Sequence, residues 1–299
     1  MRILLTGTSG QVGGALRPLL QDTNNLIAPA RADFDLGSPA TLAVALDRLD
    51  PQMIINPAAY TAVDRAEDEK DLAFRVNAEA VAVMARWAAE RGVPLIHFST
   101  DYIFDGSGDQ PRREDAATGP LSVYGASKLA GEHAIRDAGG AHLVVRTSWV
   151  YAAKGANFLR TIARLAGERE ELRIVADQIG APTSANVIAQ SVTSILRSQP
   201  SDIAGSFARS RGIVNIACAG QTSWHGFASA IVAGLKARGV KLKVEKVTPI
   251  EAREFSTKAR RPGNSIFDLS RLHDVFGVVT LPWKKALDVE LDRWVSETR

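Results

Sequence analysis

The feature that most restricts the fold is a glycine-rich turn placed directly after the first apolar segment. Residues 3–5 read ILL, and the residues TGTSGQVGG that follow place Gly7, Gly10 and Gly13 at three-residue spacing. Glycines at the turn from a strand into a helix let the backbone bend sharply and approach a pyrophosphate, which then lies on the helix N-terminus. The spacing favours a dinucleotide-binding turn, and its alternative is a tight turn without a ligand.

Short apolar runs alternate with helical patterns along the first half of the chain. The runs lie at residues 3–5, 26–30, 53–55, 95–99 and 143–146, and a long helical stretch from about Glu67 to Arg91 follows the third. This alternation predicts a parallel sheet with helices on both faces, a Rossmann-like doubly wound α/β fold. We expect residues 1–150 to form a dinucleotide-binding domain.

The alternation becomes irregular past about residue 150, where turns such as GAPTSAN and RRPGNS interrupt the pattern. We expect residues 151–299 to form mainly a smaller C-terminal substrate-binding lobe. Parts of residues 184–218 are expected to return to the first domain, because 186–197 has a helical pattern and 212–217 a strand pattern.

Charge and cysteine content exclude several classes of protein. The chain of 299 residues has 36 Lys and Arg against 33 Asp and Glu, with no basic run, so nucleic-acid binding has no support. Its single cysteine, Cys218, lies in the apolar run IVNIACAG and is expected to be buried, in a protein of a reducing compartment. The start has no signal-peptide pattern, and no stretch approaches the ~20 apolar residues of a membrane span. We expect a cytoplasmic protein.

The histidines show no metal-ligand spacing, so no metal site is expected. They stand at positions 97, 133, 142, 225 and 273. His97 lies within an apolar strand pattern, and we interpret it as a core residue with satisfied hydrogen bonds.

The residues after the second apolar run indicate which dinucleotide is bound. NAD sites usually end the second strand with an acidic residue that binds the ribose 2′-OH. That position is about Ala30, and Arg31 follows it. A guanidinium suits a 2′-phosphate, which favours NADPH over NADH; the alternative is a solvated Arg31.

Residues 124–128, YGASK, place a phenol and an amine one helical turn apart. If Ser122 caps a helix that runs to about Asp137, Tyr124 and Lys128 share one face. A close ammonium stabilises a phenolate, so we expect Lys128 to lower the pKa of Tyr124. Such a phenol exchanges protons near neutral pH, as reduction of a ketone requires. By itself the pattern also fits a surface tyrosine and a solvated lysine.

Hydroxyl side chains end the fourth apolar run. Ser99 and Thr100 follow LIHF, where a parallel sheet presents side chains to the crevice at its carboxyl edge. A hydroxyl there can bind a substrate carbonyl beside Tyr124. Together, the glycine turn, this hydroxyl and the Tyr–Lys pair predict a catalytic site.

These motifs resemble the extended short-chain dehydrogenase/reductase superfamily and, within it, the dTDP-4-dehydrorhamnose reductase family. The resemblance is carried by LLTGTSGQVGGAL, INPAAYTAVDRAE, HFSTDYIFDG, PLSVYGASKLAGE, VVRTSWVYA, DQIGAPTSA and RRPGNSIFDLSRL, between residues 3 and 272. It implies reduction of the C4 keto group of dTDP-4-dehydro-L-rhamnose with NADPH, to give dTDP-L-rhamnose.

The resemblance also implies roles for individual positions. Thr100, Tyr124 and Lys128 match the catalytic triad, with Tyr124 as proton donor and Lys128 also binding the nicotinamide ribose. Gly10, Gln11 and Val12 match the pyrophosphate loop, Asp35 and Leu36 the segment beside the adenine, and Ala58, Ala59 and Tyr60 the turn after the third strand. Asp101 and Trp149 match sugar-pocket positions, and Asn157, Gln178 and Arg261 are candidates for the nucleotide diphosphate.

One departure from the family concerns assembly. Some dimeric members join their subunits through magnesium and glutamates, one of them early in the first helix. Here that helix reads GGALRPLL, with no acid before Gln21–Asp22, so we expect a monomer or a weak homodimer.

Two other functions stay open. A sugar-nucleotide dehydratase carries Thr-Asp-Glu after the fourth strand, and this chain has Thr100-Asp101-Tyr102, which disfavours dehydration; another reductase or an epimerase that uses the same Tyr and Lys is harder to exclude. A non-catalytic module resembling the regulatory subunit of methionine adenosyltransferase is the remaining alternative.

Overall fold

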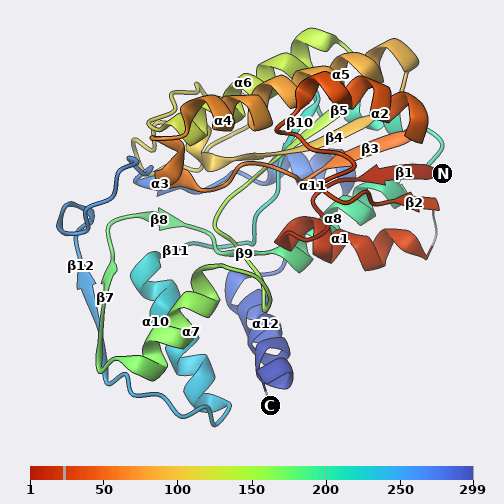
Figure 1. Ribbon diagram of the computed structural model, residues 1–299. Coiled ribbons are helices and arrows are strands. Elements are labelled where there is room, and N and C mark those ends of the chain that lie inside the picture. Colours follow the sequence, from red (N-terminus) through yellow and green to blue (C-terminus); the bar gives the residue numbers. More distant parts are fainter. Residues whose placement is uncertain (23–24, 199, 299) are drawn as a thin grey trace.

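Six parallel strands form the central sheet of the protein (Figure 1). The structure is a computed structural model that describes residues 1–22, 25–198 and 200–298. In the sheet the strands lie in the order β10-β5-β4-β3-β1-β2. They are β1 (Arg2–Leu5), β2 (Asn25–Ile27), β3 (Met53–Asn56), β4 (Leu95–Thr100), β5 (His142–Thr147) and β10 (Ile213–Asn215). The predicted Rossmann-like α/β fold is confirmed, and the strand pattern at 212–217 corresponds to β10 at the sheet edge.

Helices cover both faces of this sheet, which explains why its central strands are almost continuously apolar. On one face, apolar side chains of β1, β3, β4 and β5 pack with α1 (Gln11–Gln21), α8 (Ala185–Ser198), α9 (Ile203–Arg209) and α11 (Ser270–Phe276). On the other they pack with α2 (Leu42–Leu49), α5 (Ala80–Arg91) and α6 (Val123–Ala138).

A further hydrophobic cluster forms away from the sheet, among the helices α7 (Phe158–Glu168), α10 (Trp224–Ala237) and α12 (Trp283–Thr298) and the parallel pair β7 (Glu171–Val175) and β12 (Lys246–Ile250). Helix α8 contributes to both sides: Ile188 packs under the sheet, and Val187 packs into this second cluster. Cys218 is buried there, as predicted, and burial raises its pKa to about 11.

Short elements complete the connections. The two-residue strands are β6 (Val150–Tyr151), β8 (Ile179–Gly180), β9 (Thr183–Ser184), β11 (Thr222–Ser223) and β13 (Asn264–Ser265). The short helices are η1 (Pro39–Thr41), α3 (Val63–Ala66), α4 (Lys70–Phe74), η3 (Asp101–Ile103) and η4 (Ala252–Glu254). Among helices formed by described residues, none is long and apolar enough to cross a lipid bilayer.

The helical stretch predicted before Gly92 contains a widened turn. It forms as α4, the π-helical segment η2 (Arg75–Glu79) and α5, and ends at Gly92 in the left-handed conformation. Asn77, inside η2, is 1% exposed; its Oδ1 accepts from the Tyr60 backbone N–H, and its Nδ2 donates to the Ser127 hydroxyl. The widened turn thus joins the loop after β3 to helix α6.

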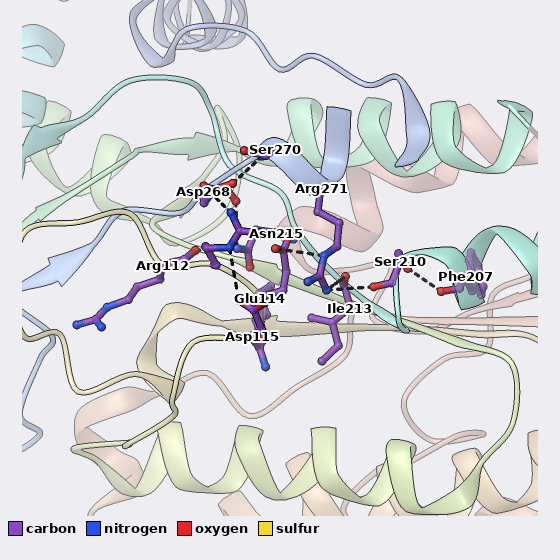
Figure 2. Close-up of polar contacts among 12 residues, drawn as sticks. Arg112, Glu114, Asp115, Phe207, Ser210, Ile213, Asn215, Asp268, Ser270 and Arg271 are labelled. Carbon is purple, nitrogen blue, oxygen red and sulfur yellow. Dashed lines mark hydrogen bonds and ion pairs between the residues drawn. The ribbon is translucent and has the colours of Figure 1, made fainter. Parts of the chain in front are cut away.

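A buried polar cluster fixes the end of β10 to two loops (Figure 2). The Asn215 backbone N–H donates to Glu114 at 3.0 Å, and its side-chain amide donates to the carbonyls of Arg112 and Asp268. Arg271 pairs with Glu114 at 3.4 Å and donates to the carbonyl of Ser210. These bonds attach the segment before α11 to the sheet edge.

Candidate active site

One cavity of about 940 Å³ runs along the carboxyl ends of β1, β3, β4 and β5. Its lining includes most positions that the sequence predicts for cofactor and substrate. These are Gly7, Gly10, Gln11, Val12, Gly13, Arg31, Asp35, Leu36, Ala58, Ala59, Tyr60, Thr100, Asp101, Tyr124, Lys128, Trp149 and Asn157. The carboxyl edge of a parallel sheet is where such folds bind ligands.

The glycine turn has the geometry of a phosphate-binding loop. Gly7 has a φ of +58°, and a Cβ there would lie 2.9 Å from the Ala58 nitrogen. A Cβ on Gly13 would lie 2.2 Å from the Gly7 carbonyl oxygen, so α1 packs against the turn only because this position is glycine. Helix α1 begins after Gly10 without a side-chain cap, and its N-terminal amides face the cavity end that an anion would occupy.

The residues after β2 form the outer part of the cavity. The Arg31 side chain is 83% exposed, and its guanidinium lies 3.3 Å from Asp35. Asp35 also accepts from the Gly37 backbone N–H at 3.0 Å. The exposed guanidinium of Arg31 thus lines the cavity from the solvent side, paired with Asp35.

Helix α6 is held at the cavity by its cap and by two close backbone approaches. The Ser122 hydroxyl accepts from the Gly125 N–H, and Gly139 ends the helix in the left-handed conformation, so the predicted helix and its cap are confirmed. A Cβ on Gly125 would lie 2.2 Å from the Tyr102 carbonyl oxygen, and one on Gly131 would lie 2.2 Å from that of Asn77. The glycine inside YGASK thus brings Tyr124 against the segment that follows β4.

The phenol of Tyr124 lies in a hydrogen-bonded group with Thr100 and Asp101. The Thr100 hydroxyl donates to Asp101 Oδ1 at 3.0 Å and forms a hydrogen bond with Tyr124. The Ser265 hydroxyl donates to Asp101 Oδ2 at 2.5 Å. Burial raises the pKa of Asp101 to about 6.

The expected lowering of the Tyr124 pKa is wrong. Burial raises the pKa of Tyr124 to about 12, the charge of Asp101 adds to the increase, and the hydrogen bond with Thr100 opposes it. Burial also lowers the pKa of Lys128 to about 8, and the amine of this 2%-exposed residue lies 3.0 Å from Nε2 of His97. The four-residue spacing reveals that Tyr124 and Lys128 are neighbours. It does not reveal that both are buried, because their burial depends on tertiary packing.

Trp149, predicted to lie in the sugar pocket, has an unusual backbone. Its φ is +50°, in the region that non-glycine residues rarely adopt, and its ring stacks on Trp224 with centroids 3.6 Å apart. A Cβ on Gly180 would lie 2.6 Å from the Trp149 ring, so that glycine makes room for the indole. These contacts fix the indole at the cavity wall.

The predicted diphosphate residues differ in position. Asn157 lines the cavity, but its side chain caps α7 and donates to the carbonyls of Ala152 and Lys154. Gln178 and Arg261 are not among the described residues that line the cavity. Arg261 instead donates to Asp64 of α3 at 2.8 Å. Sequence order alone does not reveal such partners.

Two cavity residues, Thr147 and Ser148, were missed in the sequence. The hydroxyls of Ser99, Thr147 and Ser148 and the amide oxygen of Gln11 are buried, and the structure shows no partner for them among the described residues. All four residues line the cavity, so these groups fit a polar ligand. Thr147 and Ser148 directly follow LVVR of β5, and the carboxyl-edge argument used for Ser99 and Thr100 applies equally to them.

No group of three or more His, Cys, Asp and Glu residues suited to a metal ion occurs within residues 1–22, 25–198 and 200–298. His97 is 1% exposed, and both of its ring nitrogens lie 3.0 Å from a polar partner.

Comparison with known proteins agrees with this geometry. Residues 1–295 match the family model described as RmlD substrate binding domain. A dTDP-4-dehydrorhamnose reductase of Burkholderia thailandensis is 45% identical over 290 residues, which cover 96% of this chain and 97% of that protein.

Two solved structures superpose over nearly the whole chain. A dTDP-4-dehydrorhamnose reductase from Clostridium acetobutylicum is 32% identical with a TM-score of 0.88, over 98% of this chain and 99% of the other. One from Bacillus anthracis, in complex with NADP, is 31% identical with a TM-score of 0.85, over 99% of each chain. By sequence and by structure, the chain belongs to the dTDP-4-dehydrorhamnose reductase family.

Proposed function

We propose that the protein is an oxidoreductase that reduces the C4 keto group of dTDP-4-dehydro-L-rhamnose with NADPH, giving dTDP-L-rhamnose. The observation that carries this proposal is that Thr100, Tyr124 and Lys128 share one cavity with the glycine turn. Reduction of a ketone needs a hydride on carbon and a proton on oxygen, and this cavity combines a dinucleotide cradle with a proton-donating phenol.

The residues of the cradle fit a dinucleotide. Gly7, Gly10, Gln11, Val12 and Gly13 would hold the pyrophosphate at the uncapped start of α1. Asp35 and Leu36 would lie beside the adenine, and Ala58, Ala59 and Tyr60 would border the remaining length of the cofactor. When bound, the reduced nicotinamide supplies the hydride.

The chain's own residues supply the proton. Because burial raises the pKa of Tyr124 to about 12, its phenol carries a proton at neutral pH and donates it to the oxygen on C4 as that oxygen becomes negative. The Thr100 hydroxyl, which donates to Asp101 in the structure, turns its proton to the carbonyl and holds it, and a charged Lys128 stabilises the phenolate that remains. The proton that Tyr124 loses, leaving a phenolate, becomes the proton of the new hydroxyl on C4.

The remaining substrate contacts are assigned by position. We place Asp101 and Trp149 at the sugar, and Asn157, Gln178 and Arg261 toward the nucleotide diphosphate. Residues 151–299 then act mainly as the substrate-binding lobe, and residues 1–150 as the dinucleotide-binding domain. The protein is expected to work in the cytoplasm as a monomer or weak homodimer.

The decisive experiment supplies dTDP-4-dehydro-L-rhamnose with NADPH and follows loss of NADPH absorbance together with formation of dTDP-L-rhamnose. One NADPH consumed for each product formed supports the proposal. An epimerase would convert the sugar without net NADPH oxidation, because it recycles its cofactor. A regulatory module would show no turnover and would instead bind a second protein tightly.

Replacing Arg31 with Ala is expected to weaken NADPH binding selectively. A charge-assisted bond to a 2′-phosphate contributes ~1.5–3 kcal/mol, so the KM for NADPH should rise about tenfold or more while that for NADH stays nearly constant. Steady-state kinetics with both cofactors measure this difference. A wild-type preference for NADH, or an equal effect on both cofactors, would contradict the assignment of Arg31.

Asp101 is expected to set the acid side of the pH profile. Its pKa of about 6 is raised by burial, so the carboxyl is ionised above that pH and protonated below it. Protonation turns one acceptor oxygen into a donor and breaks the bond from Thr100 or Ser265. We expect kcat/KM to fall as the pH drops through about 6 in the wild-type protein. The Asp101→Asn variant should lack this decrease at low pH. If the decrease persists in the variant, it belongs to another titrating group.

A further inference from the structure

A buried chain of polar side chains connects Lys128 to the glycine turn. Its amine lies 3.0 Å from Nε2 of His97, whose Nδ1 lies 3.0 Å from Nδ2 of Asn56. The Thr6 hydroxyl donates to Asn56 Oδ1 at 2.6 Å and accepts from the Ala58 backbone N–H at 3.3 Å. Lys128, Thr6 and Ala58 line the cavity, and His97 and Asn56 are not among its lining residues. This series of hydrogen-bonded side chains therefore begins and ends at the cavity and passes behind it.

The position of each proton in this chain follows from donor and acceptor counting. Burial and the charge of Lys128 lower the pKa of His97 far below its ordinary value, so the imidazole is neutral and has one N–H. The Asn56 amide nitrogen is a donor toward Nδ1, which puts the imidazole proton on Nε2. Nε2 then donates to Lys128, and only an uncharged amine can accept that bond.

A charged Lys128 requires the opposite arrangement. An ammonium has no lone pair, so Nε2 must accept and the imidazole proton must sit on Nδ1. The Asn56 amide then turns by half a rotation to present Oδ1 to that proton, and its nitrogen donates to Thr6. Both arrangements satisfy His97 and Asn56, and they differ by one proton on Lys128.

We propose that His97 is a positioning residue that holds the amine of Lys128 in either charge state by changing its tautomer, and that Asn56 and Thr6 transmit this change to the glycine turn. The inference deepens the proposed function, because it concerns the lysine that supports Tyr124. A pKa of about 8 for Lys128 makes both charge states accessible close to neutral pH.

The other charges around Lys128 are compatible with this role. Glu132, one turn further along α6, raises the pKa of Lys128, but its carboxylate is paired with Arg146 of β5. The charge of Asp101, at the start of η3, raises the pKa of Tyr124. Among described residues no carboxylate forms an ion pair with Lys128, and its amine contacts His97 instead.

The first test reads the tautomer of His97 directly and needs neither cofactor nor substrate. In protein labelled with ¹⁵N-histidine, NMR shifts of the ring nitrogens distinguish Nδ1–H from Nε2–H. We expect the Nδ1–H form below and the Nε2–H form above the titration of Lys128, near pH 8. In Lys128→Met the change should disappear, while the signals of the other histidines stay as in the wild type.

A His97 tautomer that stays the same from well below to well above this pH, or that changes equally in Lys128→Met, would overturn the inference. Because the test is independent of turnover, it separates two failures. A protein with the tautomer change but without reductase activity would contradict only the proposed function. An active reductase with a fixed tautomer would contradict only the role of His97.

The second test compares two replacements of His97. Because phenolate stabilisation needs a charged Lys128, we expect kcat/KM of the wild type to fall as the pH rises through about 8. Leu removes the acceptor and lets an uncompensated ammonium lose its proton, so this alkaline limb should move to lower pH and activity near neutral pH should fall about tenfold or more. Gln keeps a polar group that accepts or donates and should restore most of the loss. His142→Gln, at the start of β5 and outside the cavity lining, is the matched control. An alkaline limb that does not move in His97→Leu would limit His97 to a packing role.

Discussion

Replacing Tyr124 with Phe is expected to lower kcat by ~10²–10⁴-fold, the usual cost of losing a general acid. The variant keeps the ring and its edge-to-face contact with Tyr102 at 5.5 Å, so the cavity wall should persist. NADPH affinity should therefore change little. Pre-steady-state kinetics combined with a direct titration of NADPH binding separate the two effects.

Tyr151 offers a matched control for this experiment. It is a buried tyrosine outside the cavity lining, and its hydroxyl has no partner among the described residues. Tyr151→Phe should leave turnover close to that of the wild type. Near-normal kcat in Tyr124→Phe, or an equal loss in both variants, would remove Tyr124 from the role of proton donor.

Replacing Glu132 with Ala is expected to cost ~3–5 kcal/mol of unfolding free energy, because it leaves the charge of Arg146 buried without a partner. Arg146 donates to both Glu132 oxygens, at 3.0 and 2.7 Å, and the two side chains are each 4% exposed. A third bond, from Arg146 to the carbonyl of Glu114, ties this pair to the loop of Figure 2. Urea unfolding measures the loss.

Two comparisons make the Glu132 experiment specific. The exposed pair Arg164–Glu168 lies on α7, and Glu168→Ala should cost no more than ~0.5 kcal/mol. Removing both buried partners, in Glu132→Leu with Arg146→Met, should cost less than Glu132→Ala alone, since no unpaired charge remains. A loss in Glu132→Ala as small as in the α7 control would mean that Arg146 finds another partner or water.

The fold was predictable because its signals are local. Each central strand is a short apolar run, and the glycine turn, the Ser122 cap and the end at Gly139 each depend on a few adjacent residues. The strand pattern before Cys218 also identified β10, although its neighbour β5 lies far away in sequence. The π-helical turn was not predicted, because one additional residue barely alters the apolar periodicity of a long helical stretch.

The site was only partly predictable, for the same physical reason. The positions of Tyr124 and Lys128 on one helix follow from four-residue spacing, but their pKa values depend mainly on burial by parts of the chain that are distant in sequence. The contact between Lys128 and His97 joins residues 31 positions apart, so the core interpretation of His97 identified its burial without its partner. Arg261 was placed by resemblance and by the fit of a guanidinium to a diphosphate, and its pairing with Asp64 depends on how the C-terminal segment returns to α3.

The widened turn at residues 75–79 has a consequence for insertions and deletions in this chain. A π-helical turn holds about one residue more than an α-helical turn, so the loss of one residue from this turn would let it close into an ordinary α-helical turn with the side chains of α5 still in phase. The loss of one residue between Ala80 and Trp87 would instead rotate every side chain after it by about 100°, and Trp87, whose indole donates to Asp47 of α2, would leave its partner. The widened turn can therefore absorb a change of one residue in chain length that α5 itself cannot.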